Sequence, residues 1–312
     1  MTDLLLSPAF VTAFFIAVVG AAMPLMLASA GETVGEQSGV LNLGIEGVML
    51  VGAFAAYVVK LSTGSFTMGF LVGILAGVAG SLVMLLLSVY LGLNQIVVGL
   101  AMTLVGQGMT SVLYLQNYAK SSAGTGQASP LAIPGLAEIP VLGASLFQQS
   151  ALFWVSVLGV LAIAWFLRHT NWGLSVRAAG QQPASLDAAG GSVLRTRSWS
   201  VLLGGAFAGA GGAYLVLLTT STFTPFMTNG LGYIAIVVTM LARGKMRWVA
   251  ITSLLYGATV ATGTALQLTS VSLPADVIKM LPFIVVMITL VAFSRSSAVP
   301  PALGKPYTRG AR

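Results

Sequence analysis

The polar chemistry of this sequence is concentrated between Gly31 and Ala53. Three of the seven acidic residues of the chain, Glu32, Glu36 and Glu46, lie in this one segment, which reads GETVGEQSGVLNLGIEGVMLVGA. The surrounding sequence is almost entirely apolar. Charge in such surroundings is expensive and is kept mainly where structure or function requires it. We therefore expect this segment to contain functional residues.

The composition predicts an integral membrane protein. The chain has 312 residues, of which 57% are hydrophobic and 7% are charged, whereas soluble domains carry about 25% charged residues. It has no cysteine, which excludes disulfides, thiolate metal sites and cysteine nucleophiles. Its single histidine, His169, cannot form a metal cluster alone.

The apolar runs predict an all-α fold, a polytopic transmembrane helix bundle of eight to ten spans. Candidate spans are roughly 7–29, 44–60, 66–91, 94–115, 150–167, 198–219, 230–242, 248–266 and 277–294. The runs from 44 and from 230 are short, which indicates broken or re-entrant helices. Residues 91–108 also resemble residues 229–244, as an inverted repeat would require, although a glycine-rich composition produces such similarity easily.

The basic residues predict the orientation of the chain. Placing the clusters at 168–197 and 243–247 and the tail in the cytoplasm puts 11 of the 14 Lys and Arg residues inside and 3 outside. Nine crossings then leave the N-terminus outside, whereas an even number would place it inside. We expect a transmembrane domain over 1–294, with a cytoplasmic loop at 168–197, and a disordered, proline-containing cytoplasmic tail over 295–312.

Small residues recur at the spacing that lets helices pack closely. Gly69, Gly73 and Gly77 form one such stripe, and Gly205 with Gly209 forms another. Packing replaces the hydrophobic effect between helices in lipid. We expect these stripes to pack within the chain, in preference to acting as a dimerisation motif.

The loop from Arg168 to Arg197 is long for a connection in a helix bundle. Pro183 suits the first turn of a short helix, and Gly190 with Gly191 suits its end. A short helix held in a loop can dock into a groove on a soluble partner. The alternative is a solvated loop without a partner, whose basic residues only reflect the positive-inside rule.

Five segments carry a family resemblance. They are GETVGEQSGVLNLGIEGVMLVGA (31–53), LNQIVVGLAMTLVGQG (93–108), GLSVRAAGQQPASLDAAGGSVLRTR (173–197), GGAFAGAGGAYLVL (204–217) and NGLGYIAIVVTMLARG (229–244). Together they resemble the permease subunit of ATP-binding-cassette importers, in the branch of ribose, branched-chain amino acid and nucleoside permeases. The sequence is most similar to the nucleoside type, which works with a basic membrane lipoprotein. It departs from the family pattern at Gln37, where an arginine is usual, at Gln181-Gln182, where Glu-Asn is usual, and at Ala242-Arg243, where Gly-Arg is usual.

The resemblance implies a partner set. The loop at 173–191 would carry the coupling helix that contacts an ATP-binding-cassette ATPase, with Arg177, Gln182, Pro183 and Asp187 as contact candidates. The chain has no phosphate-binding G-x-x-x-x-G-K-[ST] motif, so ATP and Mg are expected on that separate subunit and no cofactor on this chain. A second permease subunit, identical or different, and an extracytoplasmic solute-binding lipoprotein complete the expected complex in a bacterial inner membrane, with no nucleic acid.

Six residues are candidates for a path through the membrane: Asn42, Glu46, Asn94, Gln95, Gln107 and Tyr233. Asn42 and Glu46 lie four residues apart, which we expect to place them on one helix face, and they either line the path or tie helices together. The amides could bond ribose hydroxyls and base edges or serve as interhelical contacts of about 1 kcal/mol each. Tyr233 and Phe226 could stack on a base or simply pack.

We therefore predict the permease subunit of an importer for a polar, uncharged solute, a nucleoside first. The alternatives are a permease of the same superfamily for a simple sugar or a branched-chain amino acid, and a secondary transporter or facilitator. A membrane enzyme is disfavoured because the sequence offers no nucleophile–base pair, carboxylate dyad or metal cluster.

Overall fold

A computed structural model of the chain describes residues 7–119, 123–132, 134–141, 143–268, 274–293 and 299–307. Within these residues the protein is helical, and the only β-type pairing is an isolated bridge between Pro130 and Ser150. The long helices are α2 (Pro8–Gln37), α3 (Ile45–Thr63), α4 (Phe66–Met84), α5 (Gln95–Asn117), α6 (Ala151–His169), α9 (Val193–Tyr214), α11 (Met246–Leu268) and α12 (Ala275–Phe293). The shorter ones are η1 (Leu85–Tyr90), η2 (Gly143–Phe147), α7 (Asn171–Gln181), α8 (Pro183–Ala188), η3 (Leu215–Thr219) and α10 (Leu231–Ala242).

The predicted all-α polytopic bundle is confirmed. Seven helices of the described chain are long and apolar enough to cross a membrane, and two shorter apolar helices lie at Leu231–Ala242 and Met280–Thr289. The short run from 230 is indeed a 12-residue helix, α10. The run from 44 differs from our expectation, because α3 has 19 residues and is long enough to span. The break lies before α3, in the connection that leads to it.

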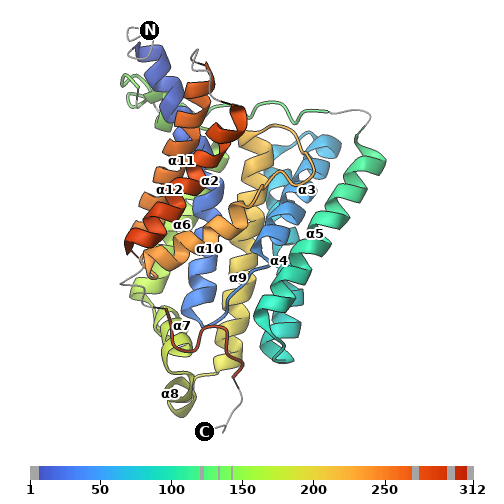
Figure 1. The fold of residues 1–312 in the computed structure, drawn as a ribbon, viewed down its shortest axis with the longest axis vertical. Coiled ribbons are helices and arrows are strands. Elements are labelled where there is room, and N and C mark those ends of the chain that lie inside the picture. The colour runs from blue at the N-terminus through green and yellow to red at the C-terminus, as the bar shows by residue number, and fades with distance from the viewer. Residues whose placement is uncertain are drawn as a thin grey trace.

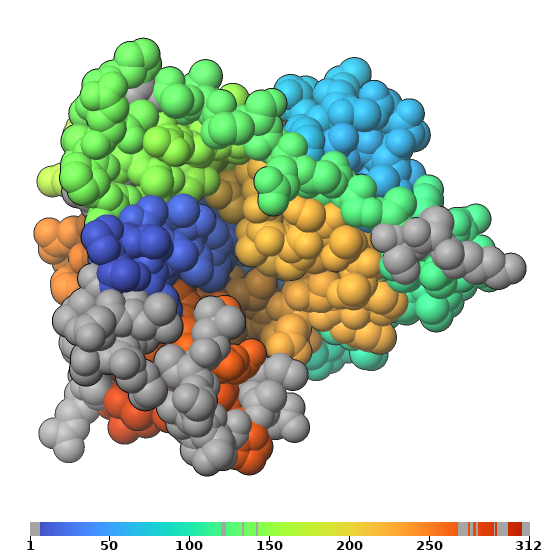
Figure 2. Space-filling model, turned by 90° about the horizontal axis from the view of Figure 1, so that it is seen from above, coloured from blue at the N-terminus to red at the C-terminus, as the bar shows by residue number. Residues whose placement is uncertain are grey.

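The described part of the chain begins with α2 at one end of the bundle and finishes at the other end, as an odd number of crossings requires (Figure 1). α7 and α8 lie at the C-terminal end, and the positive-inside rule assigns this basic end to the cytoplasm. Segments of 123–150 cross the other end of the bundle between α5 and α6 (Figure 2). The expected inverted repeat stays a prediction.

Glycines of α3, α4 and α9 make the closest helix contacts of the bundle. A Cβ atom built on Gly52 would lie 2.6 Å from the Cα atom of Gly209, and one built on Gly209 would lie 2.8 Å from the Cα atom of Gly77. A Cβ on Gly73 would lie 2.6 Å from the Cβ of Ala213. The two small-residue stripes therefore pack within the chain, as expected, and α9 lies at the centre of the bundle (Figure 1).

The tail differs from the expected disorder over residues 299–307. The amide of Ala302 donates to the carbonyl of Gly180 (3.0 Å), and the amide of Gly304 donates to the carbonyl of Gly39 (3.1 Å). Ala302 is buried. This part of the tail is therefore a strap across the cytoplasmic end of the bundle, while 294–298 and 308–312 lie outside the described residues.

Replacing Gly209 by Ala is expected to destabilise the protein by about 1–3 kcal/mol, because the added methyl group overpacks the contact between α4 and α9. The matched control is Gly108→Ala, since a Cβ at Gly108 meets no atom within 4 Å. Thermal unfolding of both variants in detergent measures the difference. Equal melting temperatures for the two variants would contradict this packing.

Candidate functional site

Residues 38–44 join α2 to α3 without helical structure, and most of them are buried. Asn42 lies in this connection, before α3 begins at Ile45, so the expectation that it shares a helix face with Glu46 is wrong. Backbone groups inside a membrane protein must be paired, because water is not available to them. The amide of Leu41 donates to the Gln95 side-chain oxygen (2.8 Å), and the amide of Asn42 donates to the Glu32 carboxylate (3.1 Å). The Asn42 side chain in turn accepts from the amide of Gly44 (3.0 Å). Three polar side chains thus accept hydrogen bonds from the backbone amides of this connection.

Several carbonyl groups of the same connection are also paired. The Arg197 side chain donates to the carbonyl of Ser38 (3.1 Å), and the Thr103 hydroxyl donates to the carbonyl of Leu43 (3.1 Å). The strap supplies the partner of Gly39. Side chains from α2, α5 and α9 therefore converge on the connection and fix its path.

Glu46 binds the N-terminal end of α10. Its carboxylate accepts from the Thr228 hydroxyl (2.6 Å) and from the amides of Gly230 (2.8 Å) and Gly232 (2.7 Å). A carboxylate at a helix N-terminus satisfies amides that have no partner in the helix and interacts favourably with the helix dipole. Glu46 is 1% exposed. Its charge is therefore fully engaged in joining α3 to the short helix α10.

The other end of α10 is held by Gln37. The Gln37 side-chain nitrogen donates to the carbonyl of Gly244 (2.6 Å). The chain leaves α10 through Arg243 and Gly244, which have φ values of +50° and +68°, a conformation that favours glycine. Gln37 and Glu46 flank the connection on its two sides. The segment 37–46 therefore forms hydrogen bonds at both ends of α10.

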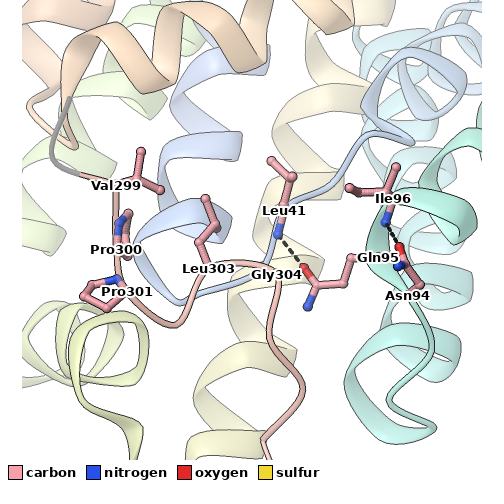
Figure 3. A pocket seen from close by; sticks show the side chains of 9 residues that line it. All are labelled: Leu41, Asn94, Gln95, Ile96, Val299, Pro300, Pro301, Leu303 and Gly304. Atoms are coloured by element: carbon pink, nitrogen blue, oxygen red, sulfur yellow. Dashed lines mark hydrogen bonds between the residues drawn. The ribbon is translucent and has the colours of Figure 1, made fainter. Parts of the chain in front are cut away.

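Asn94 and Gln95 lie together at the cytoplasmic start of α5 (Figure 3). Asn94 caps this helix by accepting from the amides of Ile96 (2.9 Å) and Val97 (3.3 Å). Both residues line a pocket of about 530 Å³ whose other wall is the strap between Val299 and Gly304. A contact of either amide with a transported solute stays a prediction.

Gln107 and Tyr233 are the two path candidates whose side chains make no hydrogen bond within the described part of the chain. Gln107 is half-buried on α5, and Tyr233 is 38% exposed on α10. Phe226, in the loop before α10, is 53% exposed. These three side chains are at least partly exposed, whereas Asn42, Glu46, Asn94 and Gln95 bind backbone groups of the protein. A contact of any of them with a solute stays a prediction.

The cytoplasmic loop contains the short helix α8 that the sequence predicted. Pro183 is its first residue, and Gly190 follows it with a φ of +84°. Leu186 points inward and packs with Ala179 of α7 and Val193 of α9. The helix is therefore anchored on its inner side, and its outer surface includes the exposed residues Ala184, Ser185 and Ala188.

The four coupling candidates occupy different positions around α8. Arg177 donates to the carbonyl of Leu167 (3.0 Å), which ties α7 to the end of α6. Gln182 is exposed and accepts from the Ser185 hydroxyl (3.2 Å), while Asp187 and Pro183 are half-buried. Sequence reasoning missed the roles of Gln37 and Arg197, because Gly244 lies 207 residues from Gln37 and Ser38 lies 159 residues from Arg197. It also missed Glu32, whose partner Asn42 is ten residues away and is brought back to Glu32 only because the chain leaves the helical conformation after α2. No group of three or more His, Cys, Asp or Glu residues that could hold a metal occurs among the described residues.

Replacing Glu46 by Gln is expected to lower stability by about 1–3 kcal/mol, because the amide NH₂ would face a donor and leave a buried group unpaired. The exposed Glu138→Gln is the matched control. Thermal unfolding in detergent measures the effect. If Glu46→Gln were as stable as Glu138→Gln, the carboxylate would not hold α10 in place.

Comparison with known proteins places the chain among transport proteins. It is 37% identical over 258 residues to a putative glucose ABC transporter permease protein of Haloferax volcanii, covering 82% of this chain and 77% of that protein. It is 30% identical to a guanosine ABC transporter permease protein of Bacillus subtilis, covering 93% and 95% of the two chains. It is 29% identical to a nucleoside ABC transporter permease protein of Lactococcus lactis subsp. cremoris, covering 92% and 93%. A family model for the permease component of branched-chain amino acid transport systems matches residues 14–290, and the chain belongs to this family of multi-pass inner-membrane permeases.

Proposed function

We propose that this chain is the permease subunit of an ATP-driven importer of nucleosides, with ATP hydrolysed on a separate subunit. The observation that carries the proposal is the α7–α8 hairpin at the basic end of the bundle. α8 is anchored by Leu186 and exposes Ala184, Ser185 and Ala188. A short helix held in this way suits a groove on a soluble partner. The absence of a phosphate-binding motif from the sequence agrees with a partner that binds the nucleotide.

The proposed complex contains a second permease subunit, an ATP-binding-cassette ATPase and an extracytoplasmic solute-binding lipoprotein. ATP and Mg belong to the ATPase, and this permease holds no cofactor of its own and binds no nucleic acid. The outer surface of α8, with Gln182 and Asp187 beside it, is the proposed contact with the ATPase. Arg177 supports this surface through its bond to Leu167.

The proposed solute is polar and uncharged. Glu46 is fully hydrogen-bonded and 1% exposed, so its charge is not available to a solute. An uncompensated charge on the solute would then be costly inside the bundle. Two relatives that match more than nine-tenths of the chain are named for guanosine or nucleosides, which favours a nucleoside. The relative named for glucose has the higher identity, so a simple sugar is the second candidate.

Substituting Ala184 by Arg is expected to reduce co-purification with the ATPase at least tenfold, because a long charged side chain on the exposed side of α8 would block a close contact. Gln148→Arg is the control, since Gln148 is exposed and belongs to the segment 143–150, which lies at the other end of the bundle (Figure 2). Both variants are compared at equal amounts of permease in the membrane. Unchanged association of Ala184→Arg would remove α8 from the proposed interface.

Uptake by the reconstituted complex tests the solute and the energy source. Proteoliposomes with permease, ATPase and binding lipoprotein are expected to accumulate labelled nucleosides only with ATP, and an excess of glucose is expected not to compete. Uptake by the permease alone would indicate a facilitator, and competition by glucose would indicate a sugar importer.

We also expect Tyr233→Ala to raise the KM for nucleosides by about 5- to 150-fold if the ring stacks on the base, with Tyr233→Phe near the wild-type value.

A further inference from the structure

Arg197 occupies an unusual position for a charged residue. It lies in the second turn of α9 and is 3% exposed. Three segments distant in sequence surround it: its guanidinium donates to the carbonyls of Ser38 (3.1 Å), Lys305 (2.8 Å) and Ala179 (3.5 Å). These acceptors belong to the α2–α3 connection, the strap and α7. A single side chain therefore joins α9 to three separate parts of the cytoplasmic end.

This arrangement is electrostatically costly. Arg197 places a positive charge close to the N-terminal end of a helix, where the helix dipole favours a negative charge. All three acceptors are neutral backbone carbonyl groups. Burying a charge requires good hydrogen bonds, and the planar fork of Arg offers donors in several fixed directions that Lys cannot reproduce. The cost suggests that the link between these segments has a purpose beyond packing.

The contacts around Arg197 connect α8 to the α2–α3 connection. Leu186 of α8 packs with Ala179 of α7, whose carbonyl accepts from Arg197. The next residue, Gly180, lies directly against the backbone at Gln37 and Gly39, because a Cβ there would lie 3.1 Å from the amide nitrogen of Gly39. A displacement of α8 would therefore reach the connection through α7 and Arg197.

The connection leads on to α10. Gln37, the last residue of α2, binds the carbonyl of Gly244 after α10, and Glu46, in the first turn of α3, binds the amides of Gly230 and Gly232 at the N-terminal end of α10. Tyr233, a path candidate that is 38% exposed, lies one residue beyond this second contact. A continuous series of hydrogen bonds and packed backbones thus runs from α8 to the helix that presents Tyr233.

We propose that Arg197 is a positioning residue that transmits movement of the α7–α8 hairpin to α10 through the segment 37–46, and so couples the ATPase to the solute path. The proposal rests on the proposed function, because it requires a partner that moves α8. It assigns to Arg197 a role in coupling that is separate from binding the ATPase or the solute. A measurement at both ends of this series of contacts tests the coupling directly.

The decisive experiment measures uptake and ATP hydrolysis together in proteoliposomes that hold the complete transporter, with a mixture of labelled adenosine, guanosine, cytidine and uridine as the probe. Arg197→Lys and Arg197→Gln are expected to co-purify with the ATPase and to keep at least half of its hydrolysis rate. The number of nucleosides moved per ATP is expected to fall at least tenfold. Arg195→Lys and Arg195→Gln are the matched controls, because Arg195 is exposed on the same part of α9. A wild-type ratio in the Arg197 variants would overturn the proposal.

Hydrogen–deuterium exchange on the assembled wild-type transporter gives a second test that does not require a stable variant. ATP binding by the partner is expected to change amide exchange in 171–188, in 37–46 and in 228–232. A change limited to 171–188 would overturn the relay even if every Arg197 variant failed to fold. If the wild-type complex moved none of the four nucleosides while these exchange changes still occurred, the proposed solute would be wrong and the relay would stand.

Discussion

The residues between α2 and α3 are not helical, although they are mostly buried in a membrane protein. Their backbone groups therefore need hydrogen-bond partners within the protein. Helices satisfy this requirement internally, but a non-helical connection depends on side chains that other segments supply. Gln95 of α5, Glu32 of α2 and Arg197 of α9 form these hydrogen bonds with the backbone of the connection. The positions of these three helices relative to one another are therefore tied to this one connection.

The same connection determines how the short helix α10 is held. A helix of 12 residues does not cross a membrane, so its ends lie within the protein and their unpaired groups need partners. Glu46 supplies them at the N-terminal end, and Gln37 contacts the turn after the C-terminal end. Glycine at 232 is required for this contact, because a Cβ there would lie 2.6 Å from the Cα atom of Glu46. Tight glycine packing around α9 supports the arrangement from the other side.

The sequence was sufficient for the fold class, the short α10, the short α8 and the glycine stripes, because hydropathy, proline and glycine act locally. It was not sufficient for the partners of Glu46 or Arg197, since Thr228 lies 182 residues from Glu46 and Ser38 lies 159 residues from Arg197. Polar residue types pointed to Asn42, Glu46, Asn94 and Gln95 as path candidates. In the structure these same side chains accept hydrogen bonds from backbone amides that have no partner within a helix. Which amides lack a helical partner becomes apparent only in the folded chain. The strap was missed because three prolines in a tail are typical of disorder, whereas Ala302 and Gly304 pair with Gly180 and Gly39.

An experimental structure of the assembled transporter with a nucleoside bound would test the central claim most directly, namely that Glu46 serves α10 and not the solute. We expect the Glu46 carboxylate to keep its bonds to Thr228, Gly230 and Gly232, and the nucleoside to contact uncharged side chains such as Gln107 and Tyr233. A nucleoside hydrogen-bonded to Glu46, with α10 released from it, would contradict this account.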